Sequence, residues 1–352
     1  MGRHSATTIV LAFCLIGVVS FPSSSFSSKG WAEARAMERF AGVGPRDCAI
    51  NPRVGSKDDK LTVDEQPSPD GAIELHLRGT KVDGRGWIDA VTSCLDADRA
   101  VLFARDVDLD IKVDTLTGYG SETLRDLVVQ ISARAGRMRS FSLSAKFGNY
   151  GSLRGELRTD AQGESFIQIE ADDAAALLRL MNLYSRMTGG LMSAAIRLAG
   201  AGKQEMEGKL EIRDFSVAEP VLESLVEHPT CTRRSCSAHH NLKVGRLRVE
   251  FIHKNAKLTI RDATMLAASF GATLNGTIQT QTRVMNLHGT ALWARDFGAQ
   301  PLASCDMQTS SYELRGSMQA PELRIGPLTL LSSPSALRLF GLCERPPSIQ
   351  YP

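Results

Sequence analysis

The stretch that decides the fold is Ala171–Phe215, ADDAAALLRLMNLYSRMTGGLMSAAIRLAGAGKQEMEGKLEIRDF, which combines a helical pattern with two alternating ones. Asp172 and Asp173 precede an apolar run, where a carboxylate can accept the free N–H groups of a helix N-terminus. Gly189 and Gly190 follow the run, and glycine readily adopts the left-handed conformation that ends many helices. The sequence therefore predicts a helix over 173–188. Its apolar face, at a spacing of three and four, would carry Leu177, Leu178, Met181 and Tyr184.

Two strands are expected directly after this helix. Apolar and polar residues alternate from Met192 to Leu198 and again from Met206 to Ile212. An alternation of period two is typical of strands with one buried and one solvated face. Similar stretches recur along the chain at 73–77, 107–113, 141–146, 151–158, 165–170, 247–251, 258–260, 272–278, 284–287 and 314–318. About a dozen strands at short, turn-separated intervals predict a mainly β protein with an antiparallel, meander-like sheet.

Three further short helices are expected, near 122–133, 220–226 and 334–342. In the first of these segments, apolar residues at helical spacing share one side. They are Leu124, Leu127, Val128 and Ile131.

Length and composition favour one large domain or two ordinary ones. The chain has 352 residues and a formal net charge of +2, with 30 glycines and 14 prolines that suit many strands and turns. It has no basic block or aromatic-basic interleaving, which argues against nucleic acid as a partner. A polar, turn-rich linker is expected over 35–70, a β domain over 71–342 and a tail over 343–352.

The N-terminal segment, residues 1–34, has the features of a targeting sequence. Thr7–Phe21 is an uncharged run of about 15 residues, which fits a signal-peptide core better than the roughly 20 residues needed to span a bilayer. A small-residue cleavage site, Ala32-Glu33-Ala34, follows at some distance, so an uncleaved N-terminal anchor is the alternative. Both interpretations place the β domain outside the cytoplasm.

Six cysteines follow the leader, an even number that permits disulfides in an exported chain. The favoured pair is Cys231 and Cys236, in a polar stretch. His239 and His240 follow closely, which raises a metal site as an alternative, and free thiols are another. The spacing is not a standard zinc pattern, and the neighbouring arginines would oppose a cation, so no metal is predicted.

Two other patterns bear on chemistry. The acidic row of RDVDLDIKVD lacks the turn glycine and terminal glutamate of a calcium loop, so we interpret it as a solvated strand face. The chain also lacks the common motifs of nucleophilic, phosphate-binding and zinc-dependent enzymes. We therefore expect no enzyme activity, no catalytic residues and no cofactor.

Five stretches, taken in order, resemble the AsmA-like superfamily, specifically the C-terminal region of long envelope proteins of the AsmA, TamB and YhdP type. They lie at Ser140–Arg158, Ala171–Gly190, Gly208–Leu225, Ala272–Thr290 and Tyr312–Gly341. The resemblance implies strands stacked along one axis into an elongated, partly open curved sheet, a trough with an apolar inner face. The inward-facing set would be Ile73, Leu75, Leu77, Leu109, Ile111, Leu210, Ile212, Leu247, Val249, Leu274 and Ile278.

The resemblance also implies a function, since relatives are thought to carry phospholipid between the inner and outer membranes of Gram-negative cells. A trough would shield acyl chains at about 0.8 kcal/mol per buried CH₂. The expected partners are phospholipid, the surface of the inner or outer membrane, and an envelope protein. The expected location is the periplasm, or the inner membrane with the domain facing the periplasm.

The short chain leaves alternatives to lipid transport or envelope homeostasis. Family members run to many hundreds of residues, whereas a dozen strands at about 4.8 Å each stack to under about 60 Å. The alternatives are a structural or assembly factor for outer-membrane proteins, as for TamB-like relatives, and a truncated relic of a longer protein.

Overall fold

The computed structural model describes ten segments of the chain. They are residues 61–88, 106–135, 137–148, 151–197, 205–218, 241–267, 270–280, 282–294, 307–317 and 320–331.

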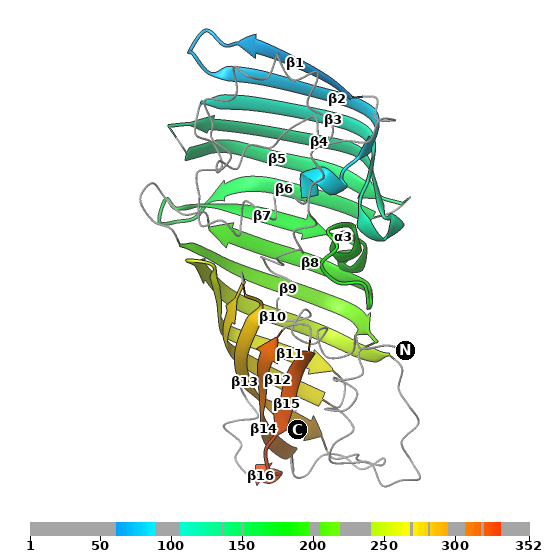
Figure 1. Ribbon diagram of the computed structural model, residues 1–352, viewed down its shortest axis with the longest axis vertical. Coiled ribbons are helices and arrows are strands. Elements are labelled where there is room, and N and C mark those ends of the chain that lie inside the picture. The colour runs from blue at the N-terminus through cyan, green and yellow to red at the C-terminus, as the bar shows by residue number, and fades with distance from the viewer. Residues whose placement is uncertain are drawn as a thin grey trace, which may run out of the picture.

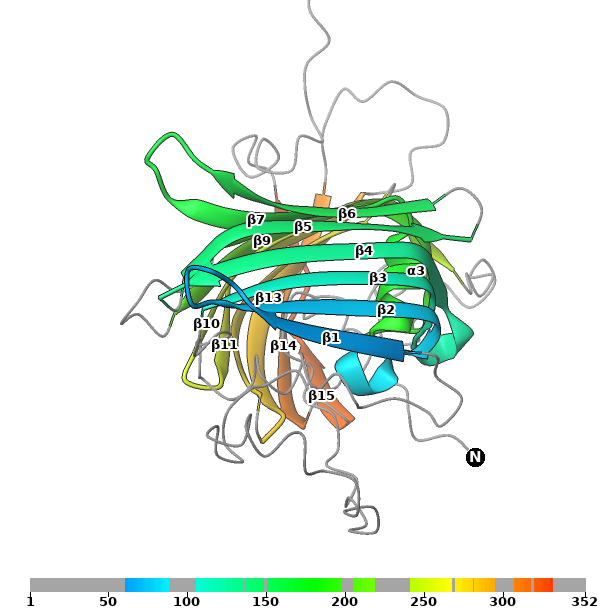
Figure 2. The same cartoon turned by 90° about the horizontal axis from the view of Figure 1, so that it is seen from above.

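The described residues form one long, open, curved β-sheet, which confirms the predicted fold class (Figures 1 and 2). The strand order follows the chain from β1 to β15, and β16 pairs with β14. The strands of the first half are β1 (Leu61–Pro67), β2 (Ile73–Asp83), β3 (Val107–Thr117), β4 (Thr123–Arg134), β5 (Arg137–Phe147), β6 (Gly151–Thr159), β7 (Ser165–Ala171) and β8 (Met187–Arg197). Those of the second half are β9 (Met206–Val217), β10 (Leu242–Lys254), β11 (Lys257–Ala267), β12 (Phe270–Gln279), β13 (Val284–Ala294), β14 (Met307–Ser317), β15 (Ala320–Ile325) and β16 (Thr329–Leu331).

One pair of neighbouring strands departs from the expected meander. β2 and β3 run parallel, with Leu75 beside Leu109 and Leu77 beside Ile111, whereas the other paired strands are antiparallel. Parallel neighbours need a crossover connection rather than a tight turn. Its start is visible as a helical turn at residues 85–88, where the Ile88 N–H donates to the Gly84 carbonyl over 2.9 Å.

The helix predicted near 122–133 is wrong, because this segment is strand β4. Leu124 and Leu127 are both buried, and they lie three residues apart because the register shifts between them. Asp126 adopts a φ of 52° at this irregularity. An extra residue in a strand separates two apolar residues of one face by three positions instead of two. A separation of three positions is also typical of one face of a helix.

The helix predicted over 173–188 exists but is shorter. Helix α3 is Ala174–Leu180, and the Asp173 carboxylate caps it by accepting from the Ala176 N–H over 2.9 Å. The chain then reverses, with Asn182 at a φ of 54°. The two glycines predicted to stop the helix instead lie within β8, at positive φ. The helices predicted near 220–226 and 334–342 fall outside the described residues.

The step in β4 recurs as a short sequence pattern. Apolar-Arg-Asp-apolar occurs at 124–127 in β4, at 212–215 in β9 and at 260–263 in β11. At each of these Arg-Asp steps the two flanking apolar residues are buried while Arg and Asp are exposed. The step thus keeps one face of a long strand apolar across an interruption in its alternation.

The sheet has two differently built rims. At the hairpin rim, to the left in Figure 1, the strands end at or near Ile73, Arg134, Arg137, Thr159 and Arg197. At the helix rim, to the right, α3 lies over the ends of the strands near β8.

Strand β1 also begins before the predicted domain. It lies inside the segment 35–70 expected to be a polar linker, and it pairs with β2 from Leu61↔Gly79 to Pro67↔Ile73.

Candidate functional site

The candidate site is the apolar face of the sheet, which is built from rows of side chains running across the strands. Residues paired in register on neighbouring strands project from the same face. One row crosses twelve strands without interruption. It runs Val63, Leu77, Ile111, Val129, Leu143, Gly155, Ile169, Ala194, Leu210, Val249, Ala263 and Leu274.

All eleven residues predicted to line a trough lie on this face, but they differ in exposure. Ile73, Leu75 and Leu109 are half-buried. The other eight are at most 8% exposed, namely Leu77, Ile111, Leu210, Ile212, Leu247, Val249, Leu274 and Ile278. The predicted residues of β9, β10 and β12 are therefore covered, whereas three of the five on β2 and β3 stay partly accessible.

The accessible part forms a second row, which we call the apolar strip. Its members are all half-buried: Leu75, Leu109, Ile131 and Phe141 on β2–β5, and Leu157, Ile167 and Ile196 on β6–β8. Phe141 connects the two runs, because its ring lies against Gly155 of β6. A Cβ added to this glycine would lie 2.9 Å from the ring. Five of the seven members do not belong to the predicted set, and Ile131 is absent from it because the spacing of its segment predicts a helix.

A large aromatic side chain ends the strip at β9. Ile196 pairs with Gly208, and Gly208 pairs with Phe251 of β10. A Cβ on Gly208 would lie 2.1 Å from the Phe251 ring, so the ring covers the glycine. Phe251 is 1% exposed, and its strand partner on β11, Ile260, is 2% exposed, so the row of the strip is covered at this point.

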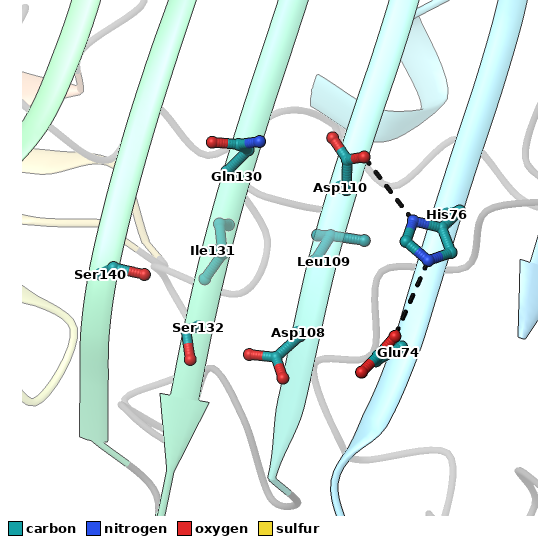
Figure 3. Close-up of a pocket in the computed structure, with 9 residues that line it drawn as sticks. All are labelled: Glu74, His76, Asp108, Leu109, Asp110, Gln130, Ile131, Ser132 and Ser140. Carbon is teal, nitrogen blue, oxygen red and sulfur yellow. Dashed lines mark ion pairs between the residues drawn. The ribbon is translucent and has the colours of Figure 1, made fainter. Parts of the chain in front are cut away.

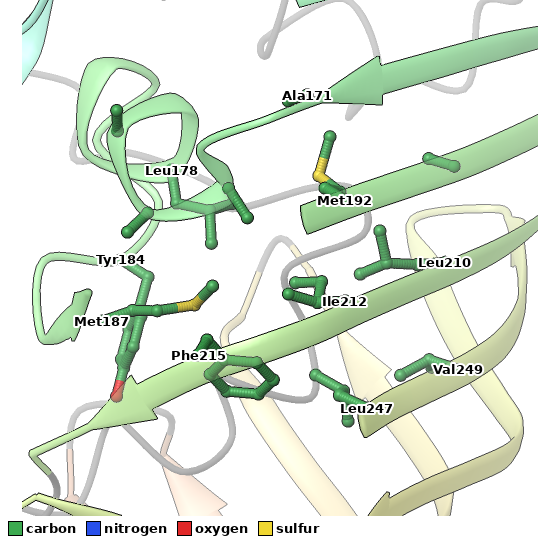
Figure 4. Packing of buried hydrophobic residues seen from close by; sticks show 14 of the residues in the cluster. Ala171, Leu178, Tyr184, Met187, Met192, Leu210, Ile212, Phe215, Leu247 and Val249 are labelled. Carbon is green, nitrogen blue, oxygen red and sulfur yellow. The ribbon is translucent and has the colours of Figure 1, made fainter. Parts of the chain in front are cut away.

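Helix α3 closes the apolar face at the helix rim. Leu178 of α3, Tyr184 and Met187 pack with Ile212 and Phe215 of β9 in one buried cluster (Figure 4). Arg179 holds the helix in place, because its Nε lies 2.6 Å from Glu122 Oε1 and its Nη1 donates to the Met187 carbonyl over 2.9 Å. The apolar strip is thus bounded by α3 on one side and open toward the hairpin rim.

The opposite face of β2–β5 is polar and carries a shallow hollow of about 230 Å³ (Figure 3). His76 stands there between two carboxylates, with its Nδ1 3.6 Å from Asp110 Oδ2 and its Nε2 3.9 Å from Glu74 Oε2. Both distances exceed those of hydrogen bonds. Gln130, Ser132 and Ser140 add further polar groups, and Leu109 and Ile131 of the strands below also border the hollow.

The acidic row on β3 is held by arginines. Arg134 contacts Asp70 at 2.8 Å and Asp108 at 2.6 Å, and Arg78 pairs with Asp110. Hydrogen bonding to Arg134 lowers the pKa of Asp108. Burial opposes ionisation of Asp110, but the hydrogen bond from Arg78 and the charges of Arg78 and Lys112 outweigh it and lower the pKa of that carboxyl as well. The arrangement agrees with a solvated, ion-paired face.

Two kinds of feature are absent from the described residues. They contain no group of three or more histidine, cysteine, aspartate or glutamate side chains arranged to hold a metal ion. Nor do they contain a helix long and apolar enough to cross a membrane. The predicted Cys231–Cys236 disulfide and the neighbouring histidines lie outside the described residues.

Comparison with protein-family models, with curated proteins and with solved structures found no match to this chain.

Proposed function

We propose that this chain is a non-enzymatic cell-envelope protein that holds phospholipid acyl chains on the apolar strip and contributes to lipid transport between membranes or to envelope homeostasis. The observation that carries the proposal is the strip itself, a continuous row of half-buried apolar residues on an open sheet. Contiguous apolar patches that remain partly open to solvent commonly mark binding sites.

The dimensions of the strip suit an acyl chain. Six strand spacings separate β2 from β8, which at about 4.8 Å each is about 29 Å. The hydrocarbon of one bilayer leaflet is about 15 Å thick, half of a core of about 30 Å, so an extended chain fits along the strip. Each CH₂ covered there would gain about 0.8 kcal/mol. Head groups would stay in solvent at the open side.

The predicted assembly-factor alternative would use an edge strand for pairing with a client. β1 stands at one end of the strand order and carries Asp64, Glu65 and Pro67. Charged residues and proline on an edge hinder strand addition. For this reason we favour lipid holding.

The test is whether lipid copurifies and whether it depends on the strip. Protein purified without detergent should yield phospholipid in an organic extract analysed by mass spectrometry. The double variant Phe141→Ser/Ile167→Ser should lose most of this lipid, because it places two hydroxyls in the centre of the strip.

The matched control changes exposed apolar residues of the other face. Leu191 is 45% exposed and Val284 is 47% exposed, and each adjoins a residue of the buried face. Leu191→Ser/Val284→Ser should retain the lipid. An extract of the unaltered protein that contains no lipid, or equal loss in both variants, would refute the proposal.

A further inference from the structure

Most cations at the hairpin rim are neutralised by carboxylates. Arg134 pairs with Asp70 and Asp108, Arg158 with Glu156, Arg197 with Glu164 at 3.0 Å, and Lys254 with Glu205 at 3.5 Å. These pairs leave little positive charge along the rim.

The β4–β5 hairpin is different. Arg137 and Arg139 are exposed, and within the described part of the chain neither lies within ion-pair distance of a carboxylate. Lys257, on the distant β10–β11 hairpin, shares this property. Among the hairpins that the structure describes at this rim, only β4–β5 carries two such cations, and they flank the half-buried Met138.

The local backbone fixes the position of these arginines. Arg134 pairs with Arg137, and Ala135 between them has a φ of 51°, which suits a two-residue turn. The Ala135 N–H donates to Asp106 Oδ1 over 2.6 Å and anchors the turn to β3. Arg139 lies at the register shift between the Ser132–Ser140 and Ala133–Met138 pairs. The two cations are therefore held at the rim.

The hairpin adjoins the open side of the apolar strip. Phe141 lies two residues beyond Arg139 on the same strand, and its partner Ile131 is also a member of the strip. Met138 pairs with Ala133, which lies on the apolar face beside Val107. Two cations without a carboxylate partner among the described residues thus stand where an acyl chain would enter the strip, whereas α3 covers the other rim.

We propose that the β4–β5 hairpin docks this protein on an anionic phospholipid bilayer, with Arg137 and Arg139 against the head groups and Met138 between them. The inference rests on the proposed lipid-holding function, because docking by this rim turns the open side of the strip toward the bilayer. Basic residues near an anionic membrane surface contribute about 1 kcal/mol each, and an apolar side chain among them adds burial at the interface.

The experiment is sedimentation of the full-length protein with vesicles of phosphatidylcholine alone or with one third phosphatidylglycerol. The unaltered protein should partition onto the phosphatidylglycerol vesicles and much less onto phosphatidylcholine. Arg137→Gln/Arg139→Gln should partition about 30-fold more weakly, the effect of two cations at about 1 kcal/mol each. Raising the salt concentration should reduce the difference, because ions screen exposed charges.

The matched control removes two exposed cations at the helix rim, Lys81 and Lys243, which also have no carboxylate partner among the described residues. Lys81→Gln/Lys243→Gln has the same net charge as the hairpin variant and should bind within about twofold of the unaltered protein. Equal loss in both variants would show that only net charge matters and would overturn the inference. Vesicle binding of the hairpin variant equal to that of the unaltered protein would also overturn the inference. Displacement of the protein from vesicles by millimolar inorganic phosphate at constant ionic strength would do so as well.

The same samples separate this inference from the proposed function. If the hairpin variant binds vesicles normally and the purified protein still carries lipid, docking is refuted and lipid holding stands. If the protein docks through the hairpin but no lipid is ever extracted, lipid holding is refuted instead.

Discussion

The contact that ends the apolar strip can be tested by adding one methyl group. In Gly208→Ala the new Cβ would lie 2.1 Å from Phe251 Cζ and 2.3 Å from Cε1. Carbon atoms in contact are separated by about 3.5 Å, so the ring would have to retreat by about 1.4 Å. Phe251 is 1% exposed, so its ring would have to move against buried neighbours rather than into solvent. Overpacking of this kind costs about 1–3 kcal/mol.

The assay is urea-induced unfolding, combined in a double-mutant cycle with Phe251→Leu. The smaller side chain makes room for the methyl group, so Gly208→Ala should cost much less in that background, with a coupling of about 0.5–3 kcal/mol. Gly245→Ala is the control, since its nearest neighbour, the Leu266 carbonyl oxygen, is at an ordinary 3.7 Å. A Gly208→Ala protein as stable as the original would refute the packing argument. So would additive losses of unfolding free energy for Gly208→Ala and Phe251→Leu in the double variant.

Two further predictions concern polar groups. Tyr312 is buried, burial raises its pKa, and its hydroxyl donates to the Thr273 carbonyl over 2.7 Å. Tyr312→Phe should lower the free energy of unfolding by about 1–3 kcal/mol, because the carbonyl loses this donor. A loss below about 0.3 kcal/mol in urea unfolding would contradict this role. Folding lowers the pKa of three carboxyls, those of Asp70, Asp108 and Asp110. Their contribution to stability is therefore present above the unfolded pKa of about 3.9, and it is lost as the pH falls through the lower folded pKa values. Urea unfolding from pH 6 to pH 3 should show this acid loss, and Asp108→Asn should reduce it; an equal loss in the variant would argue against the Arg134 contacts as its source.

The alternation of apolar residues is sufficient to predict the class of fold. It identifies both strands after α3 and places all eleven trough residues on one face, because strand periodicity directly determines the face of each residue. It fails at the Arg-Asp steps, where one skipped position gives Leu124 and Leu127 the spacing of a helix. The apolar-Arg-Asp-apolar pattern is present in the sequence at all three steps, but it also occurs at 104–107, where β3 only begins.

The accessibility of the site cannot be predicted in the same way. Leu75 and Leu247 stand in the same kind of alternating pattern, yet Leu75 is half-buried and Leu247 is 1% exposed. The alternation does not show which side chains of neighbouring strands cover a residue, as Phe251 of β10 covers Gly208 of β9. Likewise, only the structure shows that Asp70 and Asp108 pair with Arg134, which leaves Arg137 and Arg139 without a carboxylate partner in the part of the chain that is described.

The agreement between strand order and chain order has a consequence for folding. From β3 to β15 each strand pairs with the one that precedes it, so most contacts form between neighbouring segments of the chain. Closing short loops costs little entropy, and stacked units of this kind can nucleate at any hairpin and grow outward. The parallel β2–β3 pair and the β9–β10 pair, which is separated by residues 218–241, are the two slower closures we expect. An additional hairpin could therefore lengthen the sheet at its end during evolution without disturbing the strands already paired.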